Sequence, residues 1–227
     1  MRMRKKPNLL PRMEKCAAVL LREPEALRGR WLQTFPPYTK MHLELGCGKG
    51  GFTCKTAADM PGVFLAAVER VPEALVVAME RATAAELPNV RFLCADVASL
   101  SSVFADGEAE RIYINFCDPW PGGKKHARRR LTAQSFLELY RRILSPGGEI
   151  HFKTDNAPLF EWSLEQFALN GFSLTQVTRD LHRDGIQGVM TDFEEKYHSQ
   201  GIPICRCVAI KPEDGKENSP IEEPSGN

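Results

Sequence analysis

The sequence lacks the cysteine and histidine patterns typical of metalloproteins and disulfide-rich proteins. Its seven cysteines include no C-x-x-C pair, and its five histidines show no ligand spacing. An odd number of cysteines, several of them in apolar runs, favours free thiols in a reducing compartment. We therefore expect no bound metal.

Long apolar runs are also missing. No segment approaches the roughly 18 uninterrupted apolar residues of a membrane-spanning helix, and the basic N-terminus has no apolar stretch typical of a secretion signal. Hydrophobic residues nevertheless make up 43% of the 227 residues, which is enough for a full core. These features predict a cytoplasmic protein that does not bind a membrane.

The chain has almost no net charge, since its formal value is +1. The charges are unevenly distributed, however. Residues 1–15 carry six basic side chains against one acidic one, residues 124–130 carry five basic ones, and residues 211–227 carry five acidic ones against two lysines. The acidic tail thus masks two basic clusters, which favour a polyanionic partner over a merely solvated surface.

Apolar segments of strand length alternate with helical patterns from residue 41 onward. We predict strands at 41–45, 63–69, 90–94, 111–116, 149–153, 172–178 and 203–210, and helices at 72–86, 132–144 and 158–170. This alternation predicts a mostly parallel sheet with helices on both faces. We divide the chain into a basic N-terminal arm and helix (1–35), one α/β domain (36–210) and a disordered acidic tail (211–227).

A glycine-rich loop follows the first long strand. Gly46, Gly48 and Gly50 fit the G-x-G-x-G pattern of methyltransferases, whereas Gly46, Gly48 and Gly51 fit the G-x-G-x-x-G pattern of dinucleotide enzymes. Glycines at these positions let a ligand approach the backbone closely. The loop alone leaves both ligands open.

Three acidic residues near this loop narrow the choice of ligand. Glu69 ends the next strand and can accept the hydroxyl protons of a ribose, and Asp96 follows the third strand and can accept the amine of adenine. Glu44 can face the ammonium group of a methionine moiety, but it would repel a pyrophosphate. Together these acids favour S-adenosylmethionine over NAD.

The fourth strand leads into a loop of unusual composition. Asp118 is followed by Pro119-Trp120-Pro121 and then by the basic segment 124–130. Prolines stiffen a loop, and a stiff loop can hold Asp118 in the fixed geometry that a reaction needs. We interpret this loop as the reaction site.

These motifs together resemble the bacterial tRNA (guanine-N7-)-methyltransferase family. The similarity extends over about residues 1–210 and is carried by the segments 43–51, 118–121, 124–132, 146–156 and 191–197. It implies a Rossmann-like class I S-adenosylmethionine-dependent methyltransferase fold with a seven-stranded, mostly parallel sheet. It also implies methylation of N7 of a variable-loop guanosine in tRNA, by a monomer or a homodimer.

The pattern and the resemblance together give a set of expected site residues. Asp118 is the expected catalytic residue, and S-adenosylmethionine is expected to contact Glu44, Gly46, Gly48, Gly50, Glu69, Asp96 and Asp118. The resemblance implies guanosine contacts at Lys124, Asp155, Thr191, Asp192, Phe193 and Glu194, where Lys124 replaces a family lysine because Gly122-Gly123 lengthens the loop. Basic residues expected to bind RNA are Lys125, Arg128, Arg129 and Arg130.

The chemistry of guanine N7 fits this set. N7 carries a lone pair and no proton, so it can attack the sulfonium methyl group without a general base. Our hypothesis is that the carboxylates of Asp118, Asp155 and Glu194 stabilise the positive charge that develops on the base. Three alternatives stay open: a methyltransferase with another substrate, an NAD-dependent oxidoreductase, and an RNA-binding protein without catalysis.

Overall fold

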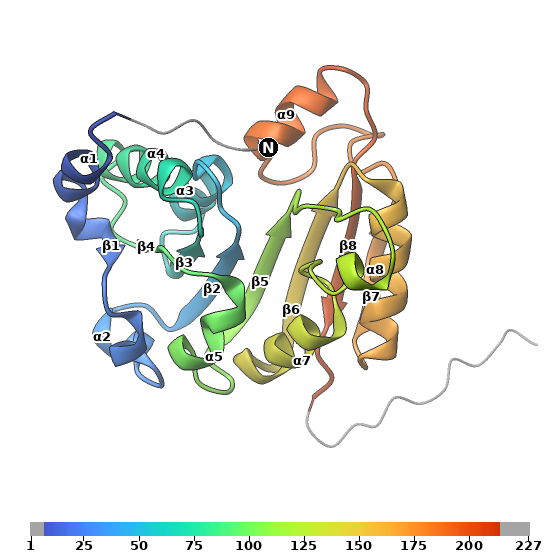
Figure 1. Cartoon of the computed structure of the whole chain (residues 1–227), viewed down its shortest axis with the longest axis horizontal. Coiled ribbons are helices and arrows are strands. Elements are labelled where there is room, and N and C mark those ends of the chain that lie inside the picture. Colours follow the sequence, from blue (N-terminus) through green and yellow to red (C-terminus); the bar gives the residue numbers. More distant parts are fainter. Residues whose placement is uncertain (1–6, 214–227) are drawn as a thin grey trace, which may run out of the picture.

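The strands form one eight-stranded sheet in the order β1-β4-β3-β2-β5-β6-β8-β7 in the computed structural model, which describes residues 7–213 (Figure 1). They are β1 (Leu20–Leu21), β2 (Lys40–Leu45), β3 (Val63–Val68), β4 (Val90–Leu93), β5 (Ala109–Asn115), β6 (Leu144–Thr154), β7 (Ser173–Thr178) and β8 (Cys205–Ile210). Pairings from β1 to β6 are parallel, and β8 is antiparallel to both of its neighbours. The predicted mostly parallel sheet is confirmed. The predicted number of seven strands is wrong, because Leu20–Leu21 adds a short edge strand beside β4.

Helices cover both faces of the sheet. The helices of the described residues are α1 (Leu9–Lys15), α2 (Trp31–Thr34), α3 (Gly51–Asp59), α4 (Pro72–Ala84), α5 (Leu100–Val103), α6 (Lys124–Ala127), α7 (Gln134–Ile143), α8 (Ala157–Leu169) and α9 (Asp192–His198), with 3-10 turns η1 (Ala17–Val19), η2 (Pro24–Leu27) and η3 (Val97–Ser99). One core layer lies between the sheet and α5, α7 and α8, and a second lies between the sheet and α3 and α4.

Strand β3 is an unbroken apolar run, and its packing explains why. All six of its residues are buried. Phe64 and Ala66 belong to the core under α5, α7 and α8, whereas Leu65 and Ala67 belong to the core under α3 and α4. Successive side chains point to opposite faces of a strand, so a strand covered on both faces must be apolar at every position.

The N-terminal segment packs onto the same sheet. The Trp31 side chain is 1% exposed, donates a hydrogen bond from Nε1 to the Val103 carbonyl at 3.0 Å, and stacks on Phe104. The Arg12 guanidinium holds α1 against α4 through two hydrogen bonds to Glu80, of 2.7 and 2.6 Å. Residues 1–6, which include four of the basic residues of the predicted arm, lie outside the described residues, as do residues 214–227 of the predicted tail.

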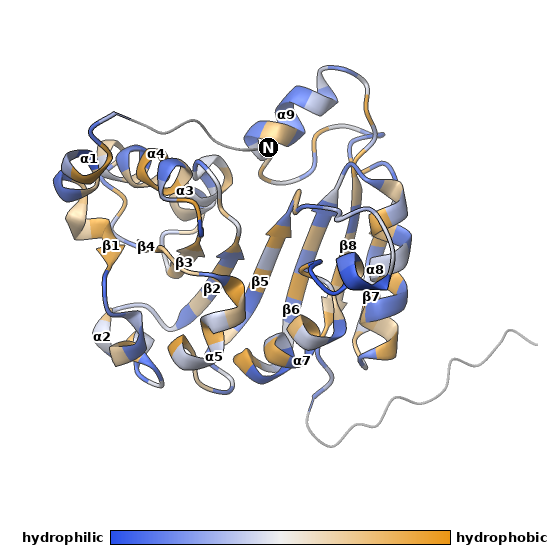
Figure 2. Cartoon of the chain, viewed as in Figure 1, coloured by the Kyte–Doolittle hydropathy of each residue, from blue (hydrophilic) through white to orange (hydrophobic). Residues whose placement is uncertain are grey.

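The parallel strands β4, β3, β2, β5 and β6 all end at the same edge of the sheet. Helix α9 lies beyond this edge, apart from the two helical layers (Figure 1). Along β5 and β6 polar residues alternate with apolar ones, and the segment around α6 is strongly hydrophilic (Figure 2). The loops after the parallel strands and the helix α9 therefore meet at one polar edge, where ligands of such folds bind.

Candidate active site

The glycine loop between β2 and α3 is held tightly on one side and open on the other. The amide of Gly46 donates to the Val68 carbonyl at 2.8 Å, which ties the loop to β3. Gly50 has φ 73°, and a Cβ added there would lie 2.6 Å from the Cβ of Ala78, so α4 leaves room only for glycine. Beside Gly48, in contrast, an added Cβ would have no atom within 4 Å. The backbone at Gly48 is thus accessible to a ligand.

Glu44 lies at the bottom of this loop as a buried carboxyl group. Its side chain accepts hydrogen bonds from the hydroxyl of Thr53 and from Nδ2 of Asn115, the latter at 3.4 Å. Burial raises the pKa of Glu44 to about 7, although both hydrogen bonds oppose the shift. The Oδ1 atom of Asn115 is buried and has no hydrogen-bond partner in the described part of the chain. Glu44 and Asn115 therefore present acceptors that suit a cationic donor group.

Glu69 and Asp96 follow the next two strands along the edge. The Glu69 carboxylate accepts from the amides of Gly48 at 3.0 Å and Val71 at 2.8 Å, so it joins the glycine loop to the start of α4. The exposed Asp96 caps η3, where its Oδ1 accepts from the Ala98 amide at 2.9 Å. Both carboxylates are oriented by backbone amides and keep free lone pairs for a ligand.

Asp118 is exposed in the loop of residues 116–123, which joins β5 to α6 and is called the Asp118 loop below. Two basic residues predicted to bind RNA contact tryptophans, one in this loop and one in α8. The Arg129 guanidinium lies 3.5 Å from the ring centroid of Trp120, and the Arg130 guanidinium lies 4.5 Å from that of Trp162 in α8. The first cation–π contact connects the Asp118 loop to the basic segment, and the second connects the basic segment to α8.

The other cations of the basic segment face solvent. Lys124, Lys125 and Arg128 are exposed on and beside α6. None of the three forms an ion pair within residues 7–213. They remain available to an anionic partner.

The segment 191–194 begins α9. Thr191 and Glu194 form a capping box, in which the Thr191 hydroxyl accepts from the Glu194 amide at 2.9 Å. Phe193 is 57% exposed and stacks on Phe116 with 6.3 Å between ring centroids. Asp155 is exposed at the end of β6, the strand next to β5. An apolar ring and a carboxylate thus lie on the Asp118 side of the edge.

The Glu194 carboxylate, in contrast, is fully buried among protein donors. It accepts two hydrogen bonds from Lys153 Nζ (3.0 and 3.1 Å) and one from the Thr191 amide (3.1 Å). His182 Nδ1 accepts from the Gln187 amide, so its Nε2 carries the proton and donates to Glu194 at 2.8 Å. Burial lowers the pKa of Lys153, and the Glu194 charge opposes this shift. This network fastens α9 to the end of β6.

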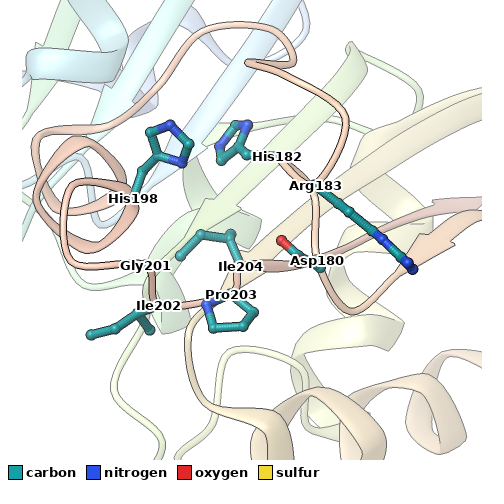
Figure 3. A pocket seen from close by; sticks show the side chains of 8 residues that line it. All are labelled: Asp180, His182, Arg183, His198, Gly201, Ile202, Pro203 and Ile204. Carbon is teal, nitrogen blue, oxygen red and sulfur yellow. The ribbon is translucent and has the colours of Figure 1, made fainter.

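A shallow hollow lies on the other side of His182, between the turn after β7 and the end of α9 (Figure 3). The rings of His182 and His198 meet edge to face there with centroids 5.1 Å apart, and Asp180 and Arg183 also line the hollow. None of the predicted site residues lines it. The hollow is therefore separate from the edge at which the predicted site residues follow the parallel strands.

Sequence reasoning missed Asn115 and Lys153. Each is a polar residue that directly follows a buried apolar one near the end of its strand, in Ile114-Asn115-Phe116 and Phe152-Lys153-Thr154. A buried polar side chain needs a hydrogen-bond partner, so a polar residue at such a position could have been recognised from the sequence as part of a site.

Comparisons with known proteins identify the family and the fold of the chain. Residues 38–207 match the model of the family described as "Putative methyltransferase". The chain is 46% identical to the tRNA (guanine-N(7)-)-methyltransferase of Geobacillus thermodenitrificans (strain NG80-2), covering 93% of this chain and 98% of that protein. The protein of the same name from Geobacillus sp. (strain WCH70) is 43% identical, with 93% and 96% covered. Among solved structures, an antibiotic related methyltransferase superposes with a TM-score of 0.59 at 18% identity, covering 80% of this chain and 91% of that chain, and confirms the predicted methyltransferase fold.

Proposed function

The chain belongs to the tRNA (guanine-N(7)-)-methyltransferase family, and we propose that it transfers a methyl group from S-adenosylmethionine to N7 of a variable-loop guanine in tRNA. One observation carries the proposal: acidic residues lie at the ends of four neighbouring strands. Asp96 follows β4, Glu69 follows β3, Glu44 lies in β2 and Asp118 follows β5. Adjacent strands are about 4.8 Å apart, so this row of acids spans the length of a nucleoside with its side chain.

The donor side of the site fits S-adenosylmethionine, which when bound supplies a methyl group on a positively charged sulfur. We assign the ammonium group to Glu44 and to the unpartnered Oδ1 of Asn115, because an ammonium group has three protons to donate. Glu69, already oriented by two amides, receives the ribose hydroxyls. Asp96 receives the adenine amine.

The acceptor side consists of Asp118 and Asp155, which follow the adjacent parallel strands β5 and β6. Guanine N7 needs no general base, so the task of these residues is to align the base and to stabilise the positive charge that appears on it. Their carboxylates also suit the N1 and N2 protons of guanine, and adenine lacks that pair of donors.

Residues 191–194 divide into two roles in this proposal. Thr191 and Glu194 are bonded to each other, Glu194 also to Lys153, and Asp192 is paired with Arg81 of α4 at 2.8 Å, so these three residues hold the segment in place. The exposed ring of Phe193 is the group of this segment that can stack on a base.

The tRNA backbone meets the basic segment. Exposed Lys124, Lys125 and Arg128 lie a few residues from the Asp118 loop and suit phosphates. No helix in the described residues is long and apolar enough to cross a membrane. We place the protein in the cytoplasm with its tRNA substrate, as a monomer or a homodimer, and light scattering distinguishes these two states.

The test is methyl transfer to unmodified tRNA followed by nucleoside analysis. We expect 7-methylguanosine from the wild-type protein, and none from a tRNA in which the target guanosine is replaced by adenosine. Asp118→Ala should abolish transfer while tRNA binding stays nearly intact, because Asp118 is exposed and forms no ion pair within residues 7–213. Methylation at another atom, or of protein or small molecules instead of tRNA, would contradict the proposal.

A further inference from the structure

The Asp118 loop has an unusual backbone that needs support from elsewhere. Phe116 and Trp120, on either side of Asp118, have φ values of 52° and 41°. Left-handed backbone is unfavourable for large side chains and persists only where surrounding contacts hold it. Pro119 and Pro121 have no amide protons, so the loop cannot support itself with hydrogen bonds from these residues.

Beside the Arg129 contact with the Trp120 ring, two side chains of the basic segment hold the loop backbone by hydrogen bonds. The carbonyl oxygens of Pro119 and Trp120 accept hydrogen bonds from Arg130, at 2.9 Å from Nε and 3.4 Å from Nη2. The carbonyl oxygen of Pro121 lies 2.8 Å from Nδ1 of His126. Three consecutive carbonyl groups after Asp118 are therefore held from the basic segment.

Arg130 is itself held by the scaffold. Its guanidinium lies over the ring of Trp162, which packs against the main core from α8. Arg130 is half-buried, whereas Arg128 is exposed and its side chain forms no ion pair with any described residue. The two arginines share the same charge and the same segment, but their surroundings differ.

We propose that Arg130 is a positioning residue that fixes the Asp118 loop to α8, and that phosphate binding by this segment is the task of its exposed cations, such as Arg128. The inference rests on the proposed function in one respect, the assignment of Asp118 as the catalytic residue. The planar guanidinium explains why arginine is needed, because one side chain donates to two carbonyls while its face stacks on the Trp162 ring. A lysine ammonium would keep the charge but not this geometry.

The experiment compares Arg130→Ala, Arg130→Lys, Trp162→Leu and Arg128→Ala. Each is measured for the single-turnover rate constant at saturating tRNA, for the tRNA Kd at several salt concentrations, and for hydrogen exchange of the 116–123 backbone. Arg142→Ala is the matched control, because it removes one positive charge from an exposed ion pair with Asp106 at the amino-terminal edge of the sheet. Thermal unfolding and S-adenosylhomocysteine binding establish that each variant is folded.

We expect Arg130→Ala to lower the single-turnover rate constant about 10- to 100-fold, since a displacement of about 1 Å can cost that much. Exchange in the loop should accelerate, while the salt slope of tRNA binding stays at the wild-type value. Arg130→Lys and Trp162→Leu should shift the same two readouts in the same direction. Arg128→Ala should instead raise the tRNA Kd and lower the salt slope by about 1, and Arg142→Ala should match the wild type.

Two results would overturn the inference. One is an Arg130→Ala protein that behaves like Arg128→Ala, with a weaker and less salt-dependent affinity but a normal rate constant and normal loop exchange. The other is a wild-type rate in Arg130→Lys, which would make charge rather than geometry the requirement. A wild-type protein that does not methylate tRNA would refute the proposed function instead, and loop exchange in the variants would still decide the role of Arg130.

Discussion

If Glu44 holds the ammonium group of the donor as proposed, ligand binding should depend on pH. Burial raises the pKa of its carboxyl group to about 7, so near pH 6 the ligand-free protein holds mostly the neutral acid. An ammonium group nearby requires the carboxylate. Binding of S-adenosylhomocysteine, which carries the same ammonium group as S-adenosylmethionine, should therefore release a proton and weaken as the pH falls.

The magnitude follows from the same pKa. If only the carboxylate binds, the apparent Kd rises by the factor 1 + 10^(pKa − pH), which gives about an eightfold weaker affinity at pH 6 than at pH 7.5. Isothermal titration calorimetry measures this change, and repeating it in buffers of different ionisation enthalpy measures the released proton. Below pH 5 the loss should approach tenfold per pH unit.

Two controls separate Glu44 from other titrating groups. 5′-Methylthioadenosine has no ammonium group, so its affinity should not fall between pH 7.5 and pH 6. Glu44→Gln should bind S-adenosylhomocysteine weakly and with little pH dependence in this range. A flat wild-type profile, or an equal slope for 5′-methylthioadenosine, would refute the reasoning.

Three further predictions concern the stability of the protein. The ligand-free protein should lose stability as the pH rises from about 4.5 to 7, because a carboxyl group with a raised pKa stabilises the fold in its protonated form. The loss through Glu44 alone should be on the order of 3 kcal/mol. Urea unfolding of the wild type and of Glu44→Gln measures the difference. Lys153→Met leaves the Glu194 charge buried without its cation and should cost about 3–5 kcal/mol in urea unfolding, whereas adding Glu194→Leu should recover much of this loss. Gly50→Ala places a Cβ 2.6 Å from the Cβ of Ala78 at φ 73°, so it should lower stability by about 1–3 kcal/mol and weaken S-adenosylhomocysteine binding. In the control Gly62→Ala the added Cβ meets no atom within 4 Å, so neither property should change. Thermal shift with and without ligand measures both effects.

The row of acids could be predicted because it depends only on where strands end. Once 41–45, 63–69, 90–94 and 111–116 are recognised as parallel strands, the residues after them must lie at one edge. The two-residue strand Leu20–Leu21 could not be predicted in this way, since two residues show no periodicity. Helix α9 was not predicted, although the sequence carries a signal for its start. Thr191 and Glu194 have the T-x-x-E spacing of a capping box.

The roles within the basic segment could not be predicted from sequence. Arg128 and Arg130 look equivalent in the run of three arginines, and the difference between them is Trp162, which is 32 residues further along the chain. An arginine that holds a loop cannot be distinguished by sequence pattern from an arginine that binds a phosphate. Arg12 is a second example. It belongs to the N-terminal basic cluster in the sequence, but in the structure it holds α1 to α4 through Glu80.

Helix α9 contacts both sides of the site, and the strengths of its contacts are unequal. On the donor side, Lys55 of α3 pairs with Glu195 and Arg81 of α4 pairs with Asp192, but all four side chains are more than 40% exposed. Exposed pairs of this kind contribute about 0–1 kcal/mol each.

On the acceptor side, the pair of Lys153 and Glu194 is buried, and breaking it leaves an unpaired charge inside the protein. Helix α9 is therefore held firmly by β6 and only loosely by α3 and α4. It follows that α9 keeps its position relative to Asp155 and the end of β6 even when its contacts with the glycine-loop side open. Lys55→Ala should accordingly cost less than about 1 kcal/mol of stability, in contrast to Lys153→Met, and an equal loss from the two changes would contradict this hierarchy.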